Sequence, residues 1–131
     1  MEPKDVTILV VDDVNAIRVQ VKDLLKGLGY RSVVVASSGE EAKEILQSQP
    51  IHLILCDWQM TPTSGIDLLK HCRSTIDHCD IAFIMVTASN TQEEVVEAVQ
   101  AGVDDYIVKP LTIDQIQSKV LKVFIRKKVF Q

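Results

Sequence analysis

Five short apolar segments recur along this chain of 131 residues, and turn or capping residues bound each of them. The segments are residues 6–11, 32–36, 51–56, 81–86 and 106–108. Continuous runs of valine, isoleucine and leucine without polar alternation are typical of strands that are covered on both faces, as in a parallel sheet. The sequence therefore predicts five buried strands.

Segments with the apolar spacing of amphipathic helices follow each strand. These are residues 14–26, 40–47, 66–72, 92–100 and 113–126. Three begin with a pattern that predicts a reciprocal capping box, namely Ser38 with Glu41, Thr91 with Glu94, and Thr112 with Gln115. Gly27 and Gly29 are expected to end the first helix, and Gly102 the fourth. Five alternating strands and helices predict one doubly wound α/β domain over residues 1–131, with right-handed crossovers.

The composition supports a single domain and excludes several classes of protein. The chain is 47% hydrophobic but only 5% aromatic, so the expected core is aliphatic. A net charge of −4 disfavours a general nucleic-acid binder, because phosphate contact needs a basic face. Three cysteines without a C-x-x-C pair favour a reducing compartment, and no apolar stretch approaches membrane-spanning length. We therefore expect a cytoplasmic monomer with no membrane or nucleic-acid partner.

Polar residues follow the predicted strands where each one ends. They are Asp12 and Asp13 after the first strand, Asp57 after the third, Thr87 after the fourth and Lys109 after the fifth. In open α/β sheets, ligands bind in the crevice outside the carboxyl ends of the strands, so these side chains are expected to converge. Three neighbouring carboxylates repel one another unless a cation neutralises them, and oxygen ligands favour Mg²⁺ over Zn²⁺. A carboxylate nucleophile, Mg²⁺, lysine and a hydroxyl group are the parts that phosphoryl transfer requires.

Four motifs together resemble the response-regulator receiver domain, and most closely its stand-alone chemotaxis type, CheY. The motifs are Val10-Val11-Asp12-Asp13, Asp57-Trp58-Gln59-Met60, Val86-Thr87-Ala88 and Asp105-Tyr106-Ile107-Val108-Lys109-Pro110. They stand in the family's order and at the expected strand ends, and the resemblance covers essentially the whole chain. It implies a flavodoxin-like, five-stranded parallel sheet with five helices and strand order 2-1-3-4-5, an order for which this family is itself a standard example.

The resemblance also assigns roles to individual residues. It implies that Asp57 accepts a phosphoryl group from a histidine kinase. It also implies that Asp13, Asp57 and the Gln59 backbone carbonyl ligate Mg²⁺, with Asp12 holding a metal-bound water. Thr87 and Lys109 are expected to contact the phosphoryl oxygens, with Tyr106 turning inward as the readout. Gln59 and Ser89 occupy positions that tune the phosphoryl lifetime, while Tyr106, Lys119 and Lys122 match a face that binds the flagellar motor switch. The Lys109-Pro110 peptide bond is expected to be cis.

Several features depart from the family or admit other interpretations. Thr61 separates Met60 from Pro62, where most members have proline directly after the methionine. A phosphohydrolase with an aspartyl-phosphate intermediate remains an alternative, although such enzymes usually carry an acid at the position of Gln59. A receiver excised from a larger regulator with a DNA-binding output is a second alternative. On balance the chain is expected to be a phosphoryl acceptor with slow self-phosphorylation and self-dephosphorylation, not an enzyme.

Two further groups of residues have an ordinary structural interpretation beside a functional one. Five cations stand near the carboxyl end, Lys119, Lys122, Arg126, Lys127 and Lys128. They are typical of a helix terminus, where cations are favoured, and alternatively form a face for an acidic partner. The pairs His71-Cys72 and His78-Cys79 suggest zinc only weakly, because the two ligands of each pair are adjacent in sequence.

Overall fold

The computed structural model describes residues 1–88 and 91–130, in which strands and helices alternate. The strands are β1 (Thr7–Val11), β2 (Ser32–Ala36), β3 (Leu53–Asp57), β4 (Ala82–Thr87) and β5 (Asp105–Val108). The helices are α1 (Asn15–Gly27), α2 (Gly39–Ser48), α3 (Gly65–Ser74), α4 (Gln92–Ala101) and α5 (Ile113–Arg126), with 3₁₀ turns at η1 (Pro3–Asp5) and η2 (Ile76–His78). Every predicted strand and helix is present, with boundaries within two residues of those expected.

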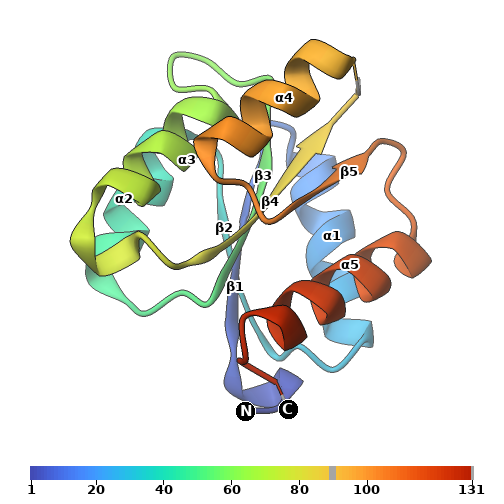
Figure 1. Ribbon diagram of the computed structural model, residues 1–131. Helices are drawn as coiled ribbons and strands as arrows, with labels where there is room; N and C mark the ends of the chain where they lie inside the picture. The colour runs from blue at the N-terminus through green and yellow to red at the C-terminus, as the bar shows by residue number, and fades with distance from the viewer. Residues whose placement is uncertain (89–90, 131) are drawn as a thin grey trace.

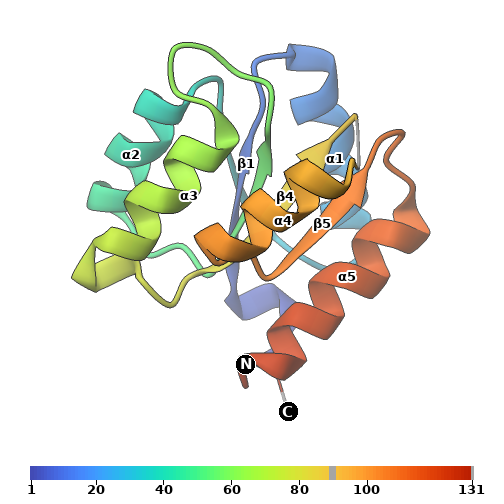
Figure 2. The same ribbon diagram turned by 45° about the horizontal axis from the view of Figure 1, so that its top comes forward.

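All strand pairs are parallel, and the strand order is β2-β1-β3-β4-β5, as the resemblance implied. Helices α1 and α5 cover one face of the sheet, and α2, α3 and α4 cover the other (Figure 1; Figure 2). The chain reverses its winding direction between β1 and β3, which are neighbours in the sheet. The carboxyl ends of these two strands therefore flank the crevice where α/β proteins of this type bind ligands.

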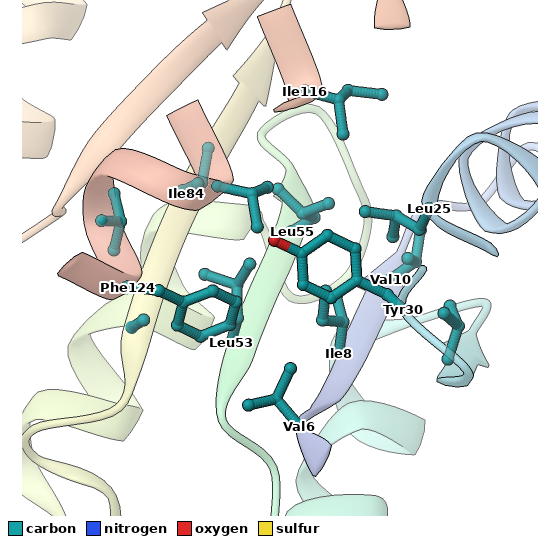
Figure 3. Close-up of a cluster of buried hydrophobic side chains, with 14 of the residues drawn as sticks. Val6, Ile8, Val10, Leu25, Tyr30, Leu53, Leu55, Ile84, Ile116 and Phe124 are labelled. Atoms are coloured by element: carbon teal, nitrogen blue, oxygen red, sulfur yellow. The ribbon is translucent and has the colours of Figure 1, made fainter. Parts of the chain in front are cut away.

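Successive residues of each strand enter two different cores. In β1, Ile8 and Val10 face α1 and α5, where they pack with Leu25 and Phe124 (Figure 3). Leu9 and Val11 face the opposite core, beneath α2, α3 and α4. Because both faces of the strands are buried, the apolar runs show no polar alternation.

The helix N-termini differ in one respect from prediction. Ser38, Thr91 and Thr112 each accept a hydrogen bond from the backbone N–H three residues later, but none of the reciprocal side-chain bonds forms. A complete capping box instead joins Ser64 and Asp67 at the start of α3, a position that was not among the predictions. The predicted helix ends are correct in part, since Gly29 and Gly102 have positive φ values of 98° and 96°, whereas Gly27 is the last helical residue of α1.

An ionic network fastens the amino ends of β4 and β5 to two helices. Arg73 of α3 donates to the backbone carbonyl groups of Gly102 and Ile81, and its guanidinium lies 3.0 Å from the Asp104 carboxylate. Arg126 and Lys127, at the end of α5, lie 3.7 Å and 3.3 Å from the other oxygen of Asp104. Two of the five cations near the carboxyl end are therefore engaged in holding the fold.

None of the helices in the described part of the chain is both long and apolar enough to span a bilayer.

Candidate functional site

Three carboxylates meet at the carboxyl ends of β1 and β3. Asp57 is the last residue of β3 and is 5% exposed, and Asp12 directly follows β1 and is 2% exposed. Asp13 is exposed beside them. One carboxylate oxygen from each of the three lies within 4.8 Å of the others. The structure thus brings together the three aspartates whose convergence the sequence predicted.

The backbone around β1 fixes the orientation of Asp12. Its N–H donates to the carbonyl of Ala36 at the end of β2, and its Oδ1 accepts a hydrogen bond of 2.9 Å from the N–H of Val14. Arg18 of α1 donates to the Asp12 carbonyl at 2.6 Å. These bonds occupy one carboxylate oxygen and leave the other facing the site.

Lys109 supplies the positive charge in this cluster. Its Nζ donates to Asp57 Oδ1 at 3.1 Å and lies 3.6 Å from Asp12 Oδ2. Its backbone N–H donates to the carbonyl of Thr87 at 2.7 Å, which ties the turn after β5 to the end of β4. The Lys109-Pro110 peptide bond is cis, as the resemblance implied, and the Thr61-Pro62 bond is also cis.

Burial and crowding of charge dominate the electrostatics of Asp57. Desolvation raises the pKa of Asp57 above its ordinary value, and the charges of Asp12 and Asp13 raise it further, although Lys109 acts in the opposite direction. Burial alone would lower the pKa of Lys109, but its hydrogen bond to Asp57 and the charges of Asp57 and Asp12 outweigh that effect and raise it. One ammonium group thus incompletely offsets three carboxylates, and the site favours a further cation.

The donor set fits magnesium. The three aspartates provide only oxygen ligands, which hard cations prefer, and Asp13 keeps the cluster open to solvent. Among the described residues, this is the only group of three or more potential ligands close enough to share an ion. Cys72 is instead buried in the core beneath α3, where desolvation raises the pKa of its thiol to about 11. Within the described residues, the His71-Cys72 and His78-Cys79 pairs form no group of ligands close enough to share an ion.

A second feature is a small apolar hollow between the end of β4 and α4. Thr87, which is 4% exposed, and Trp58 and Tyr106 line it. The ring of Tyr106 is half-buried, and Lys119 Nζ lies over it at 5.4 Å from the ring centroid while also pairing with Asp105 at 3.1 Å. Thr87 and Tyr106 are therefore neighbours, and Lys119 rests on the tyrosine as well as on an acid.

The remaining residues expected at the site have different surroundings. The Gln59 side chain is exposed two residues beyond Asp57, and Lys122 is exposed on α5. Ser89 lies outside the described residues.

Gly65 has a place in the site that the sequence did not predict. It is the first residue of α3, and a Cβ there would meet the Asp57 carbonyl and lie 2.9 Å from the Trp58 Cα. The capping pattern Ser64-x-x-Asp67 could have revealed the start of this helix.

Comparison with known proteins identifies the family. The family model for the response regulator receiver domain matches residues 8–121. A chemotaxis protein, CheY-3 of Vibrio cholerae, is 38% identical over 123 residues, which cover 94% of this chain and 95% of the relative. The chemotaxis protein CheY of Pseudomonas aeruginosa is 37% identical over 119 residues, covering 91% and 96% of the two chains.

Solved structures agree with this assignment. The crystal structure of Vibrio cholerae CheY4 superposes with a TM-score of 0.85 at 26% identity, covering 90% of this chain and 98% of the other. A response regulator receiver protein from Pseudomonas putida gives a TM-score of 0.83 at 32% identity, covering 89% and 96%. With this fold, these relatives and an aspartate cluster at the carboxyl ends of β1 and β3, the chain belongs to the response regulator receiver family of two-component signalling, and is CheY-like.

Proposed function

We propose that the protein is a phosphorylation-switched signalling module in which Asp57 accepts a phosphoryl group from the phosphohistidine of a histidine kinase. One observation carries the proposal: Asp57 is a buried carboxylate whose Oδ1 is bonded to Lys109, in a pocket shared with two further aspartates. A structural carboxylate gains little from such crowding, whereas a nucleophile for phosphoryl transfer needs nearby positive charge and a position for a cation.

In the proposed reaction, a carboxylate oxygen of Asp57 attacks phosphorus as the phosphorus–nitrogen bond of the phosphohistidine breaks. The electron pair of that bond returns to the imidazole nitrogen, and an acyl phosphate forms on Asp57. Lys109 is already within 3.1 Å of the attacking group and moves its charge to the new phosphoryl oxygens. Thr87, at the end of β4, donates its hydroxyl to another of them. Gln59 and Ser89 would govern the rate of hydrolysis.

We further propose that Asp12, Asp13, Asp57 and the Gln59 carbonyl hold Mg²⁺. When bound, the ion supplies positive charge that offsets the carboxylates and the incoming phosphoryl group. Ion binding to the folded state also stabilises it by mass action. At ten times its dissociation constant, Mg²⁺ is expected to add about 1.4 kcal/mol to the free energy of unfolding.

Thermal unfolding measures this stabilisation directly. For a chain of this size, the expected rise in melting temperature is about 5 °C. The variant Asp13→Asn removes an exposed ligand and is expected to abolish the rise without unfolding the protein. The variant Asp23→Asn, at an exposed position of α1, is the matched control and should retain it. An equal rise in Asp13→Asn would show that the ion binds elsewhere.

Intact mass measurement after incubation with Mg²⁺ and acetyl phosphate tests the proposed acceptor. The wild-type protein and Asp23→Asn are expected to gain one phosphoryl group. Asp57→Asn is expected to gain none, because its amide nitrogen and oxygen cannot form the acyl phosphate. An adduct of equal yield on Asp57→Asn would assign the acceptor to another residue and contradict the proposal.

For the output, we propose chemotaxis, with a flagellar motor switch protein as the partner. The relatives at 37–38% identity are named chemotaxis proteins, and Tyr106, Lys119 and Lys122 lie along β5 and α5 as the proposed docking face.

We also propose that residues 1–131 act as one cytoplasmic, monomeric receiver domain that does not itself bind nucleic acid. The single sheet with a core on each face supports the one-domain organisation.

A further inference from the structure

Glu94 does not make the bond that its position in α4 predicts. It is the third residue of the helix, and its backbone N–H donates to Thr91 Oγ1 at 3.3 Å. Its side chain should return this bond to the N–H of Thr91, but it does not. The Glu94 Oε2 atom is instead buried, and it has no hydrogen-bond partner among the described residues.

Glu94 lines the small hollow between the end of β4 and α4. The hollow has a volume of about 10 Å³, and Thr87, Trp58 and Tyr106 line it together with apolar side chains. A buried carboxylate oxygen without a donor is costly, so Glu94 Oε2 is an acceptor available to a hydroxyl group that turns into the hollow. The hollow is close to the lower limit for holding a water molecule.

Among the described residues that line the hollow, three have a side chain that can donate a hydrogen bond. The Thr87 hydroxyl group is the proposed donor to a phosphoryl oxygen on Asp57. Trp58 is 9% exposed, and its backbone N–H donates to the Val86 carbonyl, which holds the residue at the strand end. Tyr106 is half-buried. Its hydroxyl group can donate a hydrogen bond, and its ring can turn about the side-chain torsions to bring that hydroxyl group into the hollow.

We propose that Glu94 is the acceptor that holds the Tyr106 hydroxyl in the phosphorylated conformer. In the unphosphorylated protein, Lys119 lies over the ring, 5.4 Å from its centroid, while pairing with Asp105. Tyr106 thus has a cationic neighbour on one side and an unused carboxylate oxygen across the hollow. A hydrogen bond to a charged acceptor is strong enough to shift the balance between two conformers about tenfold. The inference rests on the proposed function and gives Glu94 a positioning role within it.

Two substitutions at Glu94 separate the hydrogen bond from simple packing. Glu94→Leu removes the acceptor but keeps similar volume, and Glu94→Gln keeps an acceptor oxygen. Gln115→Leu is the matched control, because Gln115 occupies the equivalent position in α5, makes the same half capping box and also carries a buried oxygen without a partner. Gln115 does not line the hollow.

The experiment uses Mg²⁺ and acetyl phosphate, with intact mass to measure phosphorylation. Tyr106 ring signals in NMR spectra and Trp58 fluorescence report the conformer. All variants are expected to become phosphorylated at Asp57. The wild-type protein and Gln115→Leu should then show the full response of Tyr106, while the conformer equilibrium in Glu94→Leu shifts about tenfold toward the unphosphorylated form. Glu94→Gln should recover most of the response.

The removal of the hydroxyl provides a second test. Tyr106→Phe should show the same loss of Trp58 response as Glu94→Leu, and the double variant should lose no more than either single variant. A full response in phosphorylated Glu94→Leu, or an equal loss in Gln115→Leu, would overturn the role of Glu94 alone. Absence of any phosphoryl group on the wild-type protein would overturn the proposed function, and this inference with it.

Discussion

Replacing Lys109 with methionine is expected to lower the free energy of unfolding by about 3 kcal/mol at pH 7, in the absence of Mg²⁺. Lys109 lies within 4 Å of the carboxylates of Asp12 and Asp57, which are both buried. Its removal leaves the two negative charges facing each other with no ammonium group between them. Methionine keeps most of the aliphatic stem, so the lost charge dominates over lost packing. Denaturant unfolding measures the change.

The pH dependence of this loss identifies its cause. Asp57 already has a raised pKa in the folded protein, and removing Lys109 raises it further. Between the unfolded and folded pKa values, the folded state binds more protons, so stability falls as pH rises through that interval. The deficit of Lys109→Met should therefore be small near pH 4 and complete at neutral pH. Adding Asp57→Asn to Lys109→Met should restore much of the stability, whereas an equal deficit at both pH values would implicate packing.

Replacing Gly65 with alanine is expected to damage both stability and phosphorylation. The new Cβ would meet the Asp57 carbonyl, lie 2.9 Å from the Trp58 Cα and lie 2.8 Å from the Met85 sulfur. Two of these neighbours are backbone atoms, which cannot turn aside as a flexible side chain can. We expect a loss of about 3 kcal/mol in stability, as for an overpacked core. The acceptor would also move, so the rate of phosphorylation by acetyl phosphate should fall about tenfold or more.

Gly27→Ala is the control for this substitution. Gly27 is the last residue of α1, and a Cβ there would meet nothing within 4 Å. Alanine is the better helix former, so this variant should be neutral or more stable by up to about 1 kcal/mol, with an unchanged phosphorylation rate. If Gly65→Ala matched it in both measurements, α3 would be able to withdraw from β3, and the close approach at Gly65 would not position Asp57.

The sequence was sufficient to predict most of the fold because its strongest signals are local. The unbroken apolar runs reflect strands with a core on each face, as Ile8 and Leu9 show by entering opposite cores. The placement of Asp12 and Asp57 at one edge also followed, since parallel strands end on the same side of a sheet. The strand order itself came from the family resemblance.

Other features depend on which distant residues meet, and local patterns could not reveal them. Glu94 fits a capping box in sequence, but the hollow beside Tyr106 offers its side chain another position. In the sequence, Gly65 has the pattern of an ordinary helix start, and only the structure shows how closely it approaches Asp57. The contacts of Arg73 with Asp104 span 31 positions and leave no periodic signal.

The Arg73–Asp104 network also determines where the molecule can deform. It joins α3, the amino ends of β4 and β5, and the end of α5, at the end of the sheet opposite Asp57. Several ionic and backbone bonds hold that end of the sheet, so the amino ends of β4 and β5 are fixed in position. We therefore expect a small displacement of Thr87, at the opposite end of β4, to leave the amino ends of β4 and β5 and the helices bonded to them in place.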